Sequence, residues 1–288
     1  MTRPKVHLAG QTVSLSRDTH EGIYYLNNYA ARALVLTDFQ RYAATHGQKL
    51  HVVSVLPNGI AAVCEDTTGD RSELMRDLHA RVAIVRNLDL KRKGHFWDNR
   101  KPGDTTLLDR GAVLDRIAEI VCRPVELRLV DRAEQWPGTY GPECWGRTTK
   151  VEVGKAKIVV SLEVPKCLEG LPLDEAKALA TARIDKLEAK LRRARRGPAK
   201  GFKLITRKGC SARKEVTPMS NPCFAAASKG VLDLADKALD TFREDHRIAL
   251  LAFRARNREV LFPCGTIQMR TLVCAHIAPP SRGDPMNP

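Results

Sequence analysis

Two apolar runs separated by one polar break constrain the fold of this chain more than any other feature. They form the stretch LHVVSVLPNGIAAVCED, residues 50–66, in which Pro57-Asn58-Gly59 interrupts the apolar sequence. Asn-Gly between two β-rich runs is typical of a tight hairpin, and a kinked or bulged passage is the alternative. The residues after Asn58, Gly59 to Val63, carry no side chain that can do chemistry. The stretch therefore predicts two core strands, 50–56 and 60–64, without a catalytic group.

The rest of the first half alternates between strand and helix signals. The alternating pattern of residues 5–16 predicts a first strand, and 125–131 is a candidate for a further one. Apolar residues at helical spacing predict three helices: 37–46, capped by Thr37; 72–90, capped by Ser72; and 111–122, stopped by Pro124. Together these segments predict an α+β fold, a small antiparallel sheet with helices packed on it.

The second half has a different composition and reads as mostly helical. After an ordered loop at 131–149 and a strand at 155–165, a helix rich in charged residues runs from Pro172 to about Arg196. A linker at 197–222, a last helix ending at Arg256 and a strand-like stretch at 259–275 follow. The predicted organisation is an α+β domain at 1–145, a mostly helical extension at 146–276 and a disordered tail at 277–288.

Positive charge is the strongest compositional signal. The chain has 48 Lys and Arg against 33 Asp and Glu, a net charge of +15. Such a balance indicates a polyanionic partner, usually nucleic acid, although a basic surface that only aids solubility is the alternative. Two groups of basic residues are candidates for phosphate contact, and each also fits a solvated surface. The first group is Arg76, Arg81, Arg86, Lys91, Arg92, Lys93 and Arg100, and the second is Arg192, Arg193, Arg195 and Arg196.

Common catalytic and cofactor motifs are absent. The sequence has no Gly-rich phosphate loop, no H-E-x-x-H and no G-x-S-x-G, and its eight histidines never pair as H-x-H or H-x-x-x-H. The eight cysteines form no C-x-x-C pair, so we expect reduced, buried thiols rather than a zinc site. No apolar run reaches the ~18 residues of a membrane span, and no signal peptide is evident. We therefore expect a soluble, cytoplasmic protein without metal, cofactor or membrane partner.

Several segments, taken in order, resemble the single-tyrosine HUH transposases, including the REP-associated tyrosine transposases. The stretch at 50–66 resembles the central strand of that family, which carries an H-x-H pair. Four later blocks match in the same order: GHFWDNR at 94–100, LDRIAEIVCRPVELRLV at 114–130, EQWPGTYG at 134–141 and REVLFPCGTIQMR at 258–270. Most of residues 1–145 and a short C-terminal segment are covered in this way.

The resemblance implies a ferredoxin-like or RRM-like fold and a site that has lost its chemistry. In the family, the H-x-H histidines hold a divalent metal such as Mg or Mn, and a tyrosine attacks single-stranded DNA. The histidine positions fall on Gly59 and Ala61, and the tyrosine position falls on Glu119. The family asparagine position falls on Arg123, whereas the residues Asn58, Pro124 and Val125 match the family pattern.

We therefore expect a catalytically inactive protein that binds DNA, as a hairpin or single strand. One alternative is an enzyme that still cuts or joins DNA with other residues; the nearest candidates are His51, His79, His95, Glu65 and Asp66. The other is a protein that interacts with RNA or with an acidic protein. The family resemblance also makes a homodimer possible.

Overall fold

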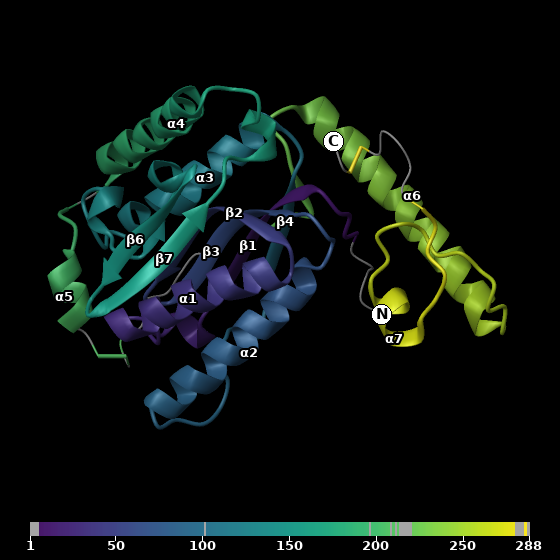
Figure 1. The fold of residues 1–288 in the computed structure, drawn as a ribbon, viewed down its shortest axis with the longest axis horizontal. Helices are drawn as coiled ribbons and strands as arrows, with labels where there is room; N and C mark the ends of the chain where they lie inside the picture. The colour runs from purple at the N-terminus through teal and green to yellow at the C-terminus, as the bar shows by residue number, and fades with distance from the viewer. Residues whose placement is uncertain are drawn as a thin grey trace.

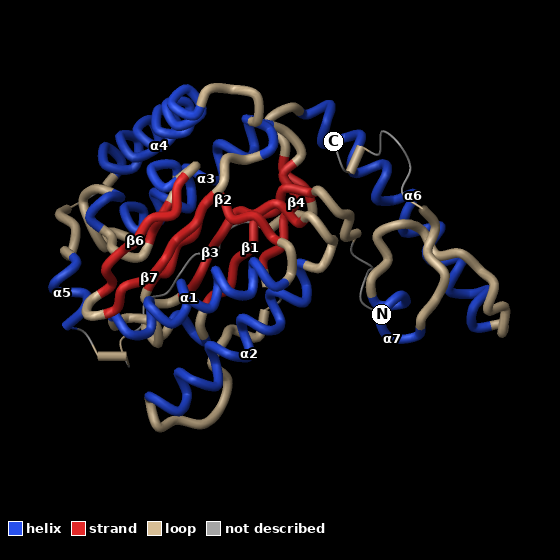
Figure 2. The backbone as a smooth tube through the Cα atoms, in the orientation of Figure 1, coloured by secondary structure: helices blue, strands red, loops and turns tan. Residues whose placement is uncertain are grey.

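The computed structural model describes residues 6–100, 102–195, 197–207, 209–210, 212, 221–279 and 285–286. Its centre is a six-stranded, mostly antiparallel sheet in the order β5-β2-β3-β1-β4-β8, with helices packed on it (Figures 1 and 2). The strands are β1 (Gln11–Asp18), β2 (Gln48–Leu56), β3 (Gly59–Asp66), β4 (Gly103–Leu107), β5 (Thr139–Tyr140) and β8 (Phe224–Ala225).

The first four strands and two helices have ferredoxin-like topology. The chain order is β1, α1 (Tyr29–Thr45), β2, β3, α2 (Arg71–Asp89) and β4, and β1 pairs antiparallel with both β3 and β4. This split βαβ arrangement places the two helices on one face of the sheet (Figure 1). The predicted fold class is therefore confirmed.

The hairpin prediction is also confirmed. Leu56 pairs with Gly59, so Pro57 and Asn58 form the turn between β2 and β3. Every residue of β3 is buried, because helices cover both faces of the sheet. The chemically empty stretch is thus a central core strand, and a bulge in β2 falls between Leu50 and Val52.

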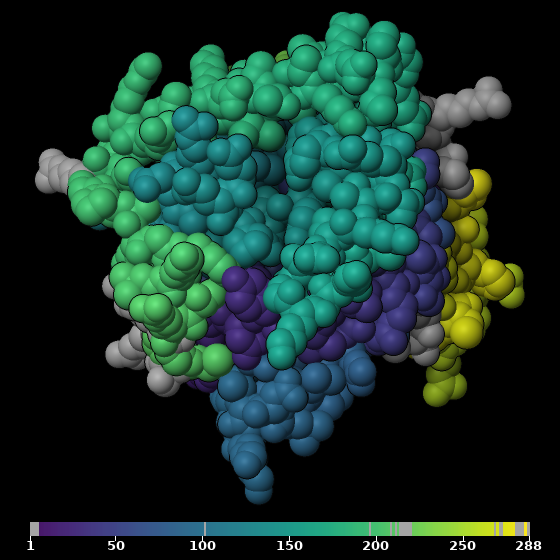
Figure 3. Space-filling view, turned by 60° about the vertical axis from the view of Figure 1, so that its left-hand side comes forward, coloured from purple at the N-terminus to yellow at the C-terminus, as the bar shows by residue number. Residues whose placement is uncertain are grey.

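The opposite face of the sheet carries two more helices, and a second hairpin lies near β2 and α1. α3 (Arg110–Glu126) packs on β2 and β3, and α4 (Leu173–Ala194) packs on the outside of α3. The two-stranded sheet of β6 (Arg147–Val153) and β7 (Ala156–Leu162) lies against α1. Figure 3 shows this side of the molecule, with α4 along its upper edge and the hairpin beside a depression over α3.

The C-terminal part extends away from this body (Figure 1). Its main element is α6 (Lys229–Arg254), which joins the body through a small apolar cluster that includes Phe224, Leu239 and Phe242. The short helix α7 (Gln268–Val273) lies beside α6, whereas the short helix α5 (Phe202–Arg207) packs on the body (Figure 1). Four 3-10 turns lie at His20–Gly22, Ala133–Gln135, Pro142–Cys144 and Lys166–Leu168. Among the described residues, no helix has the length and hydrophobicity of a membrane span.

Several sequence-based boundaries were wrong, each for a local reason. Thr37 lies inside α1, because Asn28 caps the helix by accepting a hydrogen bond from the Ala31 N–H at 2.7 Å. Pro124 does not stop α3 but lies in its last turn, and residues 127–131 then form turns rather than a strand. The fourth strand beside β1 is instead β4, whose short DTTL sequence carries little apolar signal.

The C-terminal expectations also need correction. The described part of the expected linker at 197–222 contains α5, and the stretch 259–275 contains the helix α7 rather than a strand. Only one isolated bridge, Phe262 to Ile277, has strand character there. The eight cysteines, all in the described part, are free thiols, as expected, but Cys223 and Cys274 are exposed rather than buried.

Candidate nucleic-acid interface

The family's metal-ligand positions lie on β3 opposite two small polar residues of β1. Gly59 pairs with Asp18, and Ala61 pairs with Ser16. A Cβ atom on Gly59 would lie 2.9 Å from the backbone oxygen of Arg17 and 3.0 Å from Oδ1 of Asp18. The Asp18 carboxylate thus occupies the space that a side chain at position 59 would need. Among the described residues, no group of three or more His, Cys, Asp or Glu side chains is arranged to hold a metal ion.

Charges around Asp18 are balanced by nearby partners. Arg100 lies 3.6 Å from Asp18 and donates to Asp98 at 2.8 Å. Burial raises the pKa of the Asp18 carboxyl, while Arg100 and Arg123 oppose that shift. On α3, Arg123 donates to Glu126 at 2.6 Å. The site therefore offers little net positive charge to a phosphate.

Glu119, at the family's tyrosine position, is also committed to an ion pair. Its carboxylate lies 3.2 Å from Nη1 of Arg116, one turn earlier on α3, and its side chain is 51% exposed. A carboxylate held by a neighbouring arginine is a weaker nucleophile than a phenolate or an unpaired carboxylate. The Glu119 carboxylate is therefore half-exposed and paired within α3.

The α2 residues of the first candidate group differ in what they offer to a ligand. Arg86 is 1% exposed, and its Nε and Nη2 atoms donate to the backbone oxygen of Tyr25 at 3.2 and 2.9 Å. Arg76 is exposed but contacts the carboxylates of Glu73 and Asp77. Arg81 lies 3.8 Å from the buried Asp38 carboxylate. These three guanidinium groups are engaged within the protein.

The loop after α2 contains two cations that face solvent. Lys91 and Lys93 are exposed, and within the described part of the chain neither has a carboxylate at ion-pair distance. Arg92 between them stacks on the Tyr25 ring, with its guanidinium carbon 4.3 Å from the ring centroid. Phe96 and Trp97 are buried, so the aromatics of this loop anchor it to the core.

The second candidate group lies at the C-terminal end of α4. Arg192 is 3.9 Å from Glu188, and Arg195 is 2.6 Å from Asp131. Arg193 is exposed without such a partner among the described residues. Arg196 lies outside the described residues.

Two lysines that the sequence analysis did not select join Arg193 on one side of α4. Lys186, Lys190 and Arg193 follow each other at spacings of four and three residues, so they share one face of the helix. All three are exposed, and Ala189 and Ala194 lie between and beside them on the same helix. No carboxylate among the described residues lies at ion-pair distance from these three cations. We call Lys186, Lys190 and Arg193 the α4 ladder.

The structure does not bring the two candidate groups together. α4 lies at one end of the body and α2 with its following loop at the other, in both the ribbon and the space-filling views (Figures 1 and 3). The i, i+4, i+7 spacing of the ladder was readable from the sequence once the helix was expected. In the dense arginine run at 192–196, Arg192 and Arg195 are paired with acids.

Comparisons with known proteins add one distant likeness. No protein-family model and no curated protein matches this chain. A solved structure described as "Structure of the REP associates tyrosine transposase bound to a REP hairpin" aligns with a TM-score of 0.43 and 13% sequence identity. The alignment covers 55% of this chain and 99% of that one. At this level, the similarity is a distant structural relationship.

Proposed function

We propose that this protein binds nucleic acid, through phosphate contacts along the α4 ladder. The observation that carries the proposal is the row of three exposed cations on one helix face without carboxylate partners among the described residues. Two of the exposed arginines that the sequence suggested, Arg76 and Arg100, are by contrast paired with acids. A phosphate from outside binds most favourably to cations that have no carboxylate partner within the protein.

The dimensions of the ladder suit a nucleic-acid backbone. Seven residues of α-helix rise about 10 Å, over which duplex DNA carries roughly six phosphate charges. The surrounding segment, residues 183–195, has six basic and two acidic residues, so the field around the ladder is positive. Aromatic residues make up 5% of the chain, which favours contacts to the backbone over base stacking.

We also propose that the protein does not cleave DNA at the site formed by β3 and α3. Three features of the residues there support it: Gly59 has no side chain and no room for one, Ala61 offers no ligand atom, and Glu119 pairs with Arg116. The protein would thus retain nucleic-acid binding without a metal-dependent reaction. A DNA hairpin or single strand is the ligand that we expect.

A gel experiment tests both parts of this proposal. Labelled hairpin DNA, single-stranded DNA, duplex DNA and structured RNA are mixed with the protein at two salt concentrations, with and without Mg²⁺ or Mn²⁺. Native and denaturing gels are then run side by side. We expect a shifted band that is lost at high salt and needs no metal, and no cleaved or protein-linked band.

The matched variants are a triple α4 substitution and a control of equal charge. Lys186→Ala/Lys190→Ala/Arg193→Ala should weaken binding to every ligand. The control, Lys229→Ala/Lys237→Ala/Arg247→Ala, removes three exposed cations of α6 and should bind nearly as well as the unchanged protein. Equal weakening by both variants would contradict a site on α4. A covalent, metal-dependent product would refute the proposed inactivity, and binding to RNA alone would replace DNA as the ligand.

A further inference from the structure

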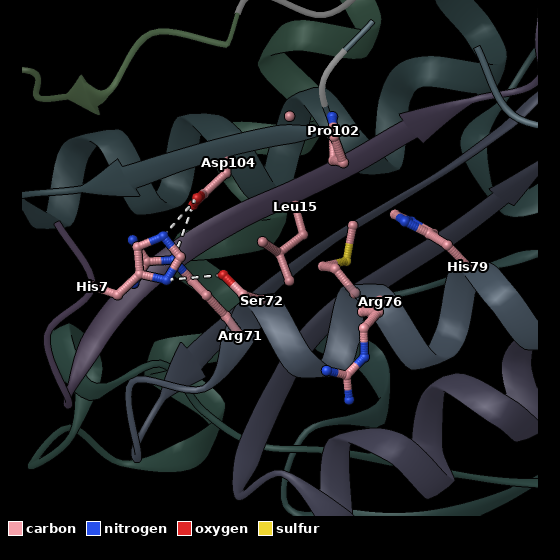
Figure 4. Close-up of a pocket in the computed structure, with 10 residues that line it drawn as sticks. His7, Leu15, Arg71, Ser72, Arg76, His79, Pro102 and Asp104 are labelled. Carbon is pink, nitrogen blue, oxygen red and sulfur yellow. Dashed lines mark hydrogen bonds and ion pairs between the residues drawn. The ribbon is translucent and has the colours of Figure 1, made fainter. Parts of the chain in front are cut away.

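A serine, a histidine and an aspartate meet at one end of a pocket that the nucleic-acid proposal does not use. The Ser72 hydroxyl lies 3.2 Å from Nδ1 of His7, and Nε2 of His7 lies 3.5 Å from Oδ2 of Asp104 (Figure 4). The three residues come from the start of α2, the segment before β1, and β4. Chain folding, not sequence proximity, therefore creates the cluster.

A buried arginine fixes the aspartate of this cluster. Nε of Arg71 donates to Oδ1 of Asp104 at 3.0 Å, which leaves Oδ2 turned toward His7. The same guanidinium contacts Asp66 at 3.3 Å, so two carboxylates share one positive charge. Asp104 is thus placed to orient the His7 ring.

The pocket beside this cluster can hold a small, partly apolar molecule. It has a volume of 310 Å³, and Leu15, Met75 and Pro102 give it apolar walls. His79 points toward it from α2, and its Nε2 atom is buried without a hydrogen-bond partner in the described structure (Figure 4). A buried polar atom without a partner indicates a ligand or water position. Convergent polar groups on an apolar pocket are typical of a small-molecule site.

We propose that Ser72 is the nucleophile of an esterase site in this pocket, acting on esters of short acyl groups. His7 takes the Ser72 proton on Nδ1 as Oγ forms a bond to the acyl carbon. The ester C–O bond then breaks, and the alcohol leaves with that proton. A water molecule next attacks the acyl carbon and gives one proton to His7. The bond from the acyl carbon to Oγ of Ser72 then breaks, and Oγ takes that proton back from His7. Overall, one ester and one water give one acid and one alcohol.

The position of Ser72 also suits the negative charge that develops on the acyl oxygen. Ser72 is the second residue of a 19-residue helix, whose dipole favours a negative charge, although the N–H groups of Glu73 and Leu74 already donate to the backbone oxygen of Asp70. The side chain is exposed at the rim of the pocket, so a substrate can reach it. This reaction is independent of the α4 ladder, which lies on a different part of the molecule (Figure 1).

Labelling with an alkyl fluorophosphonate probe and hydrolysis of p-nitrophenyl butyrate test the proposal on the full chain. We expect one label per chain at Ser72, identified by peptide mass, and no label on Ser72→Ala. Ester hydrolysis should fall to background in Ser72→Ala and by about 100-fold in His7→Gln, since a positioned base contributes that much or more.

The matched control is Ser228→Ala. Ser228 also lies exposed at the start of a helix, α6, but no histidine is bonded to its hydroxyl among the described contacts. This variant should keep full labelling and hydrolysis. If the unchanged protein and Ser72→Ala were labelled equally, or hydrolysed the ester equally fast, the proposal would be overturned. Nucleic-acid binding should be unchanged in Ser72→Ala, so failure of the esterase proposal is distinguishable from failure of the binding proposal.

Discussion

Arg71 should be among the most costly residues to replace, because two carboxylates depend on it. Its side chain is 3% exposed and contacts Asp66, which is fully buried, and Asp104. It also donates to Oε1 of Gln11 at 2.8 Å and to the backbone oxygen of Val6 at 3.0 Å. Arg71→Met replaces the guanidinium with an apolar side chain of similar size, so the buried Asp66 carboxylate loses its cation and Asp104 loses one of its partners.

Removing one partner of a buried ion pair costs about 3–5 kcal/mol, because the remaining charge stays buried and uncompensated. For a chain of this size, that loss lowers the Tm by roughly 6–20 °C. Thermal unfolding followed by circular dichroism, with urea unfolding at pH 7 as a second measurement, gives the difference. The Asp66 carboxylate keeps hydrogen bonds from Gln48 and Gly69, which places the expected cost nearer the lower value.

Arg32→Met is the matched control, since Arg32 is equally buried but has no carboxylate partner in the described part of the chain. Its guanidinium lies 4.8 Å from the Trp136 ring centroid and 4.9 Å from that of Phe202, and burial lowers its pKa to about 10. Replacing such a cation with an apolar side chain leaves no buried carboxylate without its partner. The free energy of unfolding should therefore change by less than about 1 kcal/mol. A similar loss of stability in both variants would refute the reasoning, because burial rather than charge pairing would then set the cost.

Three further predictions concern the core strand, a buried histidine and the loop after α2. Gly59→Ala should destabilise the protein by about 1–3 kcal/mol in urea unfolding, because the new methyl group meets the Arg17 backbone. Gly230→Ala should not destabilise it, because the nearest atom to the new methyl group would be Oγ of Ser228 at 3.9 Å, an ordinary contact. Burial lowers the pKa of His51 from 6.5 to about 4. As the pH falls from 7 to 5, the unfolded chain therefore takes up a proton that the folded protein does not, and the free energy of unfolding should decrease by about 2 kcal/mol more than in His51→Phe. Equal pH dependence in the two proteins would contradict this. Lys91→Ala/Lys93→Ala should weaken nucleic-acid binding less than the ladder substitution does in the same titration, and a larger effect would move the main site to this loop.

The sequence predicted the core of the fold because the core follows simple patterns. The apolar runs at 50–66 can only be buried, and the turn residues between them specify a hairpin. The four-strand ferredoxin-like arrangement could be anticipated from the resemblance, although β4 itself was missed. Its DTTL sequence gains its strand conformation from pairing with β1 rather than from its own propensity.

Candidate site residues were harder to predict, because the role of a charged side chain depends on distant partners. Arg86 continues the four-residue spacing of Leu74, Leu78 and Val82, so it faces the core, where the backbone of Tyr25 accepts its hydrogen bonds. Its charge suggested a surface role, whereas its position in the helix indicated burial. The partners of Ser72, contributed by residues 7 and 104, are not adjacent in the sequence, and only the tertiary structure shows that they meet.

The most direct test of nucleic-acid binding by the α4 ladder is the salt dependence of affinity. Fluorescence anisotropy with a labelled DNA hairpin, measured from 50 to 200 mM salt, gives the slope of log K against log salt concentration. Loss of three phosphate contacts should reduce the magnitude of this slope by about 2.7 for a duplex stem and by about 2 for a single strand. We predict this reduction for Lys186→Ala/Lys190→Ala/Arg193→Ala and little change for the α6 control. An unchanged slope in the ladder variant, or an affinity that does not vary with salt in the unchanged protein, would contradict the proposed function.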